Sequence, residues 1–253
     1  YFFEYNKIMK NLIYLGGLML VIGLFYNYYQ PNDSLTPQEE VKDVPESSKF
    51  EKPKKSAHYE SNTPAHSAIL AAAPLNVVID FNFDLTPPSS IKIEKDGTDY
   101  GVGETKIDPS ALALRRDFSS EAPDGLYKVS YSACWSDTSC HDGYFQFTID
   151  RKAKVGFSDL KNQKEVTIKL SQIKFNPFKV LVSPGTKVTW VNDDAVTHTV
   201  NTDSHPAHTY YLPQNSRKLE KDDSYSVVFD KPGIYPYHCS PHAATMQGQI
   251  VVE

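Results

Sequence analysis

Residues 233–253 read GIYPYHCSPHAATMQGQIVVE, two short apolar runs separated by a polar loop. The first run, GIYPYHC, begins after a turn-forming Pro-Gly pair, and the second run is QGQIVVE. Such runs, bounded by Gly and Pro, are typical of β-strands. The loop between them gathers Cys239, His242 and Met246 within eight residues. Each is a soft or borderline metal ligand, and the whole chain has only three cysteines and three methionines.

The same short apolar runs extend through most of the chain, and no helical 3.6-residue period stands out after residue 30. Predicted strands on either side lie in EVTIKLSQIKF (165–175), FKVLVSPGTKVTWVN (178–192), THTVNT (197–202), SYSVVFD (224–230), NVVIDFNFD (76–84), SSIKIEKDG (89–97), ALALRRDF (111–118), GLYKVSYSACW (125–135) and DGYFQFTID (142–150). We therefore predict an all-β fold with two β-sandwich domains, at 72–150 and 164–253, joined by a lysine-rich linker at 151–163.

The N-terminal region contains LIYLGGLMLVIGLFYNYY, residues 12–29, which carries no formal charge. Eighteen helical residues at about 1.5 Å each span most of a bilayer core. Lys7 and Lys10 precede this segment, so the positive-inside rule puts the domains on the extracytoplasmic side. We predict a single-pass anchor at 1–30 that binds the lipid bilayer of the cell membrane. A cleaved signal peptide is the alternative, although no small-x-small cleavage site follows.

Residues 31–71 are rich in Pro, Ser, Glu and Lys and poor in apolar clusters. A segment of this composition cannot bury enough surface to fold alone, so we predict a flexible linker. The chain as a whole is 40% hydrophobic and 23% charged, with a net charge of -5. This charge gives no reason to expect nucleic acid as a partner.

The three cysteines divide into a pair and a single residue. Cys134 and Cys140 lie six apart, which favours a disulfide over metal ligation in an oxidising compartment. Cys239 is left over, and a bound metal would protect its thiol.

A fourth ligand for the group near Cys239 is His198, in WVNDDAVTHTV, because loops from separate strand pairs meet at one end of a β-sandwich. One thiolate, two imidazoles and a thioether form the ligand set of a blue-copper electron-transfer site. Zinc is the alternative metal, but methionine is an improbable zinc ligand. The predicted copper ligands are His198, Cys239, His242 and Met246.

Three other histidines lie near this group in the sequence. His238 directly precedes Cys239, so in a strand its side chain faces the opposite side, in a packing or surface role. His205 and His208, in DSHPAHTYY, are expected in an exposed loop. A secondary metal site or a partner-docking edge is the alternative for these two residues.

Residues 164–253 resemble the plastocyanin-like cupredoxins, which are small blue-copper carriers. The matching motifs are VSPGTKVTWVNDDAVTHTV and KPGIYPYHCSPHAATMQGQIVV. The resemblance implies a Greek-key sandwich with one type 1 copper at one end, bound by the four ligands named above. It also places Thr199 where plastocyanin has Asn, next to the first histidine ligand.

Residues from about 74 to 150 resemble a CopC-type domain through APDGLYKVSYSACWSDTSCHDGYFQFTID. Asp137 matches the family's Asp-Gly-His segment, but Ser139 stands in place of the histidine and His141 comes two residues later. His66 is the candidate for the family's N-terminal histidine ligand. Because the pattern is incomplete, we expect a structural domain with a Cys134–Cys140 disulfide.

Together these features predict a membrane-anchored copper protein that carries single electrons between redox proteins at the membrane. The alternative is copper handling, meaning storage, resistance or delivery to an oxidase. An enzyme such as a multicopper oxidase is not expected, because the chain has His-Cys-Ser at 238–240 and lacks any His-x-His pair.

Overall fold

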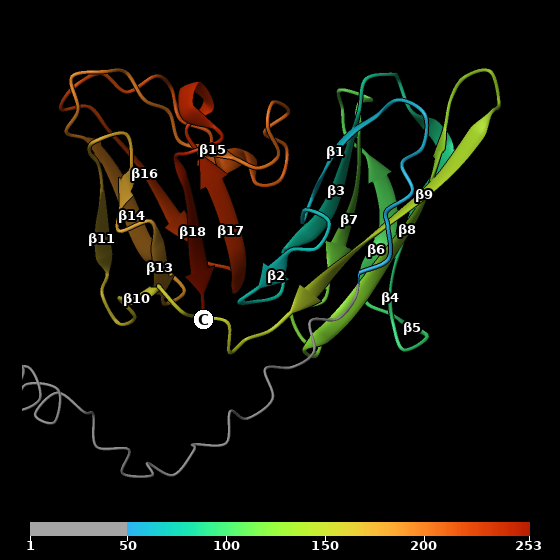
Figure 1. Cartoon of the computed structure of the whole chain (residues 1–253), viewed down its shortest axis with the longest axis horizontal. Helices are drawn as coiled ribbons and strands as arrows, with labels where there is room; N and C mark the ends of the chain where they lie inside the picture. The colour runs from blue at the N-terminus through green and yellow to red at the C-terminus, as the bar shows by residue number, and fades with distance from the viewer. Residues whose placement is uncertain (1–49) are drawn as a thin grey trace, which may run out of the picture. The chain divides into compact units, whose positions relative to one another are not determined.

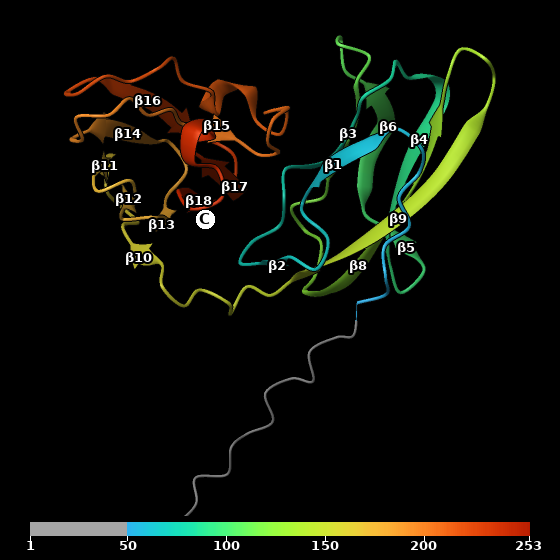
Figure 2. The same cartoon turned by 45° about the horizontal axis from the view of Figure 1, so that its top comes forward.

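Strands form nearly all the regular structure of residues 50–253, which are the residues that the computed structural model describes (Figures 1 and 2). In that range the exceptions are two 3-10 turns, η1 (Leu212–Gln214) and η2 (Ser240–His242). The predicted all-β class is confirmed for this part of the chain. The predicted anchor at 1–30 and the first part of the predicted linker lie outside the described residues. Among the described residues, no helix has the length and apolar character required to cross a bilayer.

The first sandwich has two sheets, in which the strands pair in the orders β1-β3-β7-β6 and β2-β9-β8-β4-β5. Its strands are β1 (Tyr59–Thr63), β2 (Ile69–Leu70), β3 (Asn76–Phe81), β4 (Thr86–Lys95), β5 (Thr98–Asp99), β6 (Gly101–Ile107), β7 (Ala113–Phe118), β8 (Gly125–Cys134) and β9 (Cys140–Ile149). In β8, Tyr127, Val129 and Tyr131 are buried, whereas the residues between them are half-buried. This alternation turns one face of the strand to the core between the sheets.

Strand β3 is buried along its whole length, which explains why its sequence reads as a nearly continuous apolar run. Val77 and Ile79 belong to the core of the first sandwich. Val78 points to the other face and packs with Ala113 and Tyr210, which lies in a loop of the second sandwich. The two faces of β3 are therefore covered by different parts of the chain.

The second sandwich also has two sheets, with strand orders β10-β13-β18-β17-β15 and β12-β11-β14-β16. Its strands are β10 (Ser158–Asp159), β11 (Glu165–Leu170), β12 (Phe175–Asn176), β13 (Lys179–Val182), β14 (Thr186–Asn192), β15 (Asn201–Thr202), β16 (Ser224–Phe229), β17 (Gly233–His238) and β18 (Gln247–Val252). Trp190, fully buried, contacts Phe229 and Tyr237 edge to face across the core. The last two strands pair antiparallel from Gly233–Val252 to His238–Gln247, which leaves residues 239–246 as their connecting loop.

Both segments predicted as linkers contain short strands that pair with the neighbouring sandwich. β1 and β2 lie within the predicted flexible segment 31–71, where β1 pairs with β3 and β2 pairs with β9. In the predicted linker 151–163, β10 pairs with β13, and Lys161 forms a salt bridge with Glu253 at 3.3 Å. All three strands lie at sheet edges, where main-chain hydrogen bonds to one neighbouring strand hold them. They are short, and β1 and β10 are polar, because strands held in this way need little apolar pattern.

Candidate metal centre

The loop between β17 and β18 carries three of the four predicted ligands (Figure 1). It is closed by hydrogen bonds from Cys239 N–H to the Met246 carbonyl, at 3.0 Å, and from Met246 N–H to the His242 carbonyl, at 2.9 Å. His242 N–H in turn donates to the Cys239 carbonyl at 2.9 Å. Pro241 fits the first turn of η2, where a missing N–H costs nothing. The loop is thus fixed by its own backbone.

His198 reaches the loop from the segment that connects β14 to β15. It follows β14 and is held by two main-chain hydrogen bonds with Leu219, at 3.0 and 2.8 Å. Its side chain is fully buried, and its Nδ1 lies 3.5 Å from Cys239 Sγ. His242 Nδ1 lies 3.6 Å from the same sulfur. The structure therefore brings two imidazole nitrogens, from segments far apart in sequence, to one buried free thiol.

The fourth predicted ligand, Met246, is buried and belongs to the same core cluster as Cys239. Its backbone bonds to both Cys239 and His242 place it at the closing end of the loop. His242 differs from the other three residues because its side chain is half-buried rather than buried. The group therefore has an inner side, at Met246, and an outer side, at His242.

The thiol of Cys239 also receives a hydrogen bond from a backbone amide. Thr199 N–H donates to the sulfur at 3.4 Å, and Thr199 Oγ1 accepts the N–H of Ser240 at 3.0 Å. A backbone donor does not depend on the side chain at that position. Thr199, which stands where plastocyanin has Asn, therefore makes this bond through its backbone. Its hydroxyl also links the segment that carries His198 to Ser240, the residue after the cysteine.

Asp194 orients His198, a contact that the sequence analysis missed. Its Oδ2 lies 2.9 Å from His198 Nε2. The same carboxylate accepts the backbone N–H of Gln172 on Oδ1 at 2.8 Å and the backbone N–H of Ile173 on Oδ2 at 2.9 Å. Burial raises the pKa of Asp194, but the hydrogen bonds from Ile173, His198 and Gln172 outweigh it, and the net shift is downward. An ionised carboxylate only accepts, so the proton sits on Nε2 and the lone pair on Nδ1 faces the thiol. The signal in the sequence is an acidic residue four positions before the histidine.

A second group of imidazoles lies beside the first. His205, His208 and His238 place ligand-capable nitrogens within 4.8 Å of one another. Of the two roles expected for His238, packing or surface, the structure shows packing: its side chain is buried and bonds to Asp203 and His208. His205 is exposed as expected, but His208 is half-buried. Burial, together with the neighbouring His238 and His205, lowers the pKa of His208 to about 4, which keeps its imidazole neutral.

The first sandwich has no comparable group of ligands. Within residues 50–253, only the two groups already described bring three or more His, Cys, Asp or Glu side chains together. Asp137 bonds instead to Ser139, His141 packs against Trp135, and His66 accepts the N–H of Gln146. The predicted Cys134–Cys140 disulfide is present. These contacts agree with a structural role for this domain.

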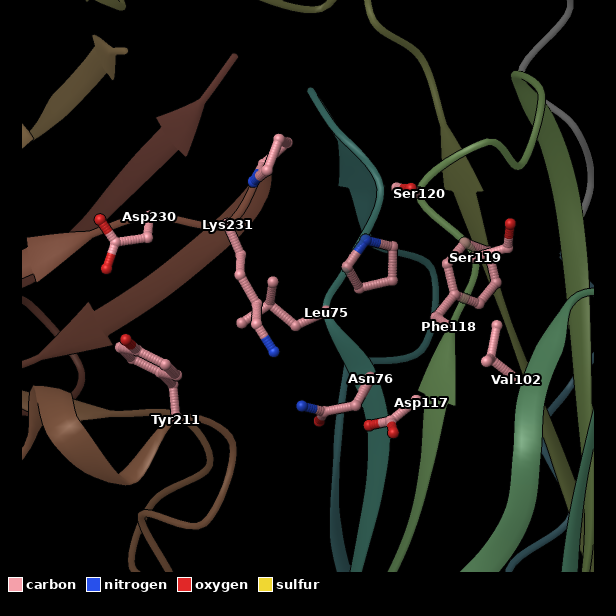
Figure 3. Close-up of a pocket in the computed structure, with 12 residues that line it drawn as sticks. Leu75, Asn76, Val102, Asp117, Phe118, Ser119, Ser120, Tyr211, Asp230 and Lys231 are labelled. Carbon is pink, nitrogen blue, oxygen red and sulfur yellow. The ribbon is translucent and has the colours of Figure 1, made fainter. Parts of the chain in front are cut away.

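A pocket of about 750 Å³ lies apart from both imidazole groups. Figure 3 shows Lys231 extending toward Leu75, with Tyr211 on one side and Asn76 and Asp117 on the other. The lining contains no His or Cys and none of the predicted metal ligands. None of the candidate metal ligands therefore lines this cavity.

Comparisons with known proteins match both sandwiches. A family model described as copper binding proteins, plastocyanin/azurin family, matches residues 162–253, and a CopC domain model matches residues 59–150. Amicyanin-alpha of Methylorubrum extorquens is 36% identical over 86 residues, which cover 34% of this chain and 70% of that protein. Plastocyanin of Scenedesmus fuscus is 35% identical over 98 residues, covering 35% of this chain and 100% of that protein.

Among solved structures, a novel purple cupredoxin from Nitrosopumilus maritimus is similar to 35% of this chain and 99% of that chain, with 27% identity and a TM-score of 0.31. The CopC match contains β1–β9, which is the whole first sandwich, and the plastocyanin/azurin match contains β11–β18, which is the second sandwich without its edge strand β10. The sequence-based resemblance is thereby confirmed, and copper, one ion per chain, is the cofactor of the family. Through residues 162–253 the chain belongs to the plastocyanin/azurin family of copper-binding proteins, and a CopC domain precedes that region.

Proposed function

We propose that this protein is a membrane-anchored, extracytoplasmic blue-copper protein that carries single electrons between redox proteins. His198, Cys239, His242 and Met246 are its copper ligands. The observation that carries the proposal is the approach of two Nδ1 atoms, at 3.5 and 3.6 Å, to one buried free thiol. Because imidazole and thiolate together suit both oxidation states of copper, the donor set fits the family's cofactor.

The protein residues hold the ligands rather than make or break bonds. Asp194 fixes the ring of His198, and the backbone bonds between Cys239 and Met246 fix the loop. When bound, copper supplies one-electron chemistry by alternating between Cu(I) and Cu(II). A rigid ligand set favours that change because little has to move. The half-buried edge of His242 is the proposed exit for the electron.

The membrane part of the proposal rests on the sequence of residues 12–29 and on the disulfide. A Cys134–Cys140 bridge fits an oxidising compartment outside the cytoplasm. An anchored head on a tether stays at high local concentration near partner proteins in the same membrane. We therefore propose redox proteins at that membrane as the electron donor and acceptor.

Copper storage, resistance or delivery is the second candidate function. The CopC match over residues 59–150 favours it, because it adds a second domain from a copper-related family to the chain. A carrier keeps its copper while electrons pass, whereas a delivery protein releases the ion to a partner. Exchange of bound copper with an external chelator therefore separates the two functions.

The test is a visible absorption spectrum of the purified full chain, titrated with Cu(II) and then reduced with ascorbate. We expect an intense blue band that saturates, bleaches on reduction and is missing from Cys239→Ala. A pale product, or a colour that survives Cys239→Ala, would reject the four-ligand assignment. Release of the copper within minutes to a chelator would favour delivery over electron transfer.

A further inference from the structure

Three histidines outside the proposed ligand set form a compact triangle. The ring centroids lie 5.4 Å apart for His205 and His208, 5.2 Å for His205 and His238, and 5.1 Å for His208 and His238. Two come from the loop after β15, and the third ends β17. The triangle thus forms without a His-x-His motif, because a loop and a strand end meet there.

The closest pair has the spacing of two ligands on one metal ion. His208 Nε2 and His238 Nε2 lie 3.2 Å apart. Metal–nitrogen bonds of about 2.0–2.1 Å place two tetrahedral ligand nitrogens roughly 3.3 Å apart. A shared metal ion would therefore require little movement of these two rings, and the exposed ring of His205 is free to adjust.

The buried member of the triangle is oriented by a carboxylate. Asp203 Oδ1 lies 2.9 Å from His238 Nδ1, so Nδ1 donates this hydrogen bond and the other ring nitrogen, Nε2, faces His208. Asp194 fixes His198 in the same way. A carboxylate behind a ligating imidazole is the usual arrangement in metal sites of proteins.

The loop that carries His205 and His208 is held on both sides. Tyr210 donates its hydroxyl to the Ile234 carbonyl and accepts the N–H of Leu75, both at 2.8 Å. From the first sandwich, Arg115 donates to the Thr209 carbonyl at 2.6 Å. The CopC domain thus fixes the backbone next to His208, so the triangle is built into the fold.

We propose that His205, His208 and His238 form a second metal site, which takes a divalent transition-metal ion and Cu(II) most strongly. Three imidazoles suit copper and zinc, and copper lies above zinc in the affinity order of such sites. The site is distinct from the blue-copper ligands but linked to them, because His238 and Cys239 are adjacent residues. Three protein ligands would leave at least one position of a four-coordinate ion for a small ligand.

The test is to load the purified full chain with excess Cu(II), remove free metal by desalting, and measure bound copper and its electron paramagnetic resonance spectrum. We expect the wild type to retain one more copper per chain than the double variant His205→Asn, His208→Asn, with the same blue band in both. Cys239→Ser should lose the blue band but keep the copper bound to the triangle. Because Cys239→Ser removes only the blue-copper thiolate, copper retained by this variant reports on the triangle alone, whether or not the proposed function is correct.

The matched control is His141→Asn, since His141 is also an exposed histidine but lies on the first sandwich. It should bind as much copper as the wild type. Equal copper content in the wild type and the double variant would overturn the proposal. So would retention of zinc but not copper when both metals are offered at equal concentration.

Discussion

The contact between Asp194 and His198 provides the sharpest test of how the metal centre is held. Asp194 accepts three hydrogen bonds, from Gln172 on Oδ1 and from Ile173 and His198 on Oδ2. Asp194→Asn has the same shape but only one acceptor oxygen. If that oxygen keeps Ile173 and His198, the new NH₂ group faces the N–H of Gln172, donor against donor. The variant therefore loses a charge-assisted bond even in its best orientation.

The expected loss of stability follows from the loss of this one hydrogen bond. A hydrogen bond to a charged group contributes about 1.5–3 kcal/mol, so the metal-free variant should unfold that much more easily. Loss of a carboxylate behind a ligating histidine costs roughly 10–100-fold in metal affinity. If a tenfold loss falls on Cu(II) alone, the reduction potential rises by about 59 mV. The direction is upward because a less basic His198 stabilises the more highly charged ion less.

The stability difference also has a definite pH dependence. The folded pKa of Asp194 is lowered, so the carboxylate contributes its full stability above the unfolded value of about 3.9, and the contribution is lost as pH falls through the lowered pKa. Asp194→Asn has no such dependence. In metal-free protein, the wild type and the variant should therefore converge in stability as the pH falls below that lowered pKa.

Urea unfolding of metal-free protein and a redox titration followed at the blue band are the two assays. Asp193→Asn is the matched control, since Asp193 bonds Lys169 at the surface, where solvent screening leaves an ion pair little effect on stability. Equal shifts in potential for the two variants, or no shift for Asp194→Asn, would refute an orienting role for this carboxylate.

Three further results are expected. Met246→Leu conserves volume at a buried position, so it should cost less than about 1.5 kcal/mol in urea unfolding, keep the blue band and raise the potential, because the thioether donor is lost. Replacing Cys134 and Cys140 by Ser removes a short cross-link and should lower unfolding free energy by about 2 kcal/mol without changing the blue spectrum; a lost spectrum would contradict a purely structural bridge. Burial raises the pKa of Asp80, so the free energy of unfolding should fall as pH rises from about 4 through that raised pKa. Asp80→Asn should abolish this decline, because the hydroxyl groups around Asp80 can donate to or accept from an amide.

Local sequence patterns determined much of the fold. In β11, the alternation of EVTIKL buries Val166, Ile168 and Leu170, as a period of two requires. The hairpin of β17 and β18 was also predictable, because its apolar runs flank a polar loop. The candidate ligands could be predicted for a different reason. Cysteine and methionine are scarce in this chain, and a cysteine, a histidine and a methionine lie close together in one loop.

The edges of the sheets were not predictable in this way. β1 and β6 are polar, and β6 contains two glycines, so neither has an apolar period to detect. Each forms because β3 or β7 offers main-chain partners beside it. Pairing of this kind depends on which backbone lies next to the segment, not on the segment's own side chains.

The tertiary structure alone decided how the polar side chains meet. Sequence placed His238 on the face opposite Cys239, but only the packing of the loop after β15 shows that this face is buried against His208. The role of Asp194 likewise depends on Gln172 and Ile173, which approach from another loop. Side-chain period fixes the side of a strand to which a residue points, whereas the groups it meets there come from distant segments, and their approach is set by the packing of both sandwiches.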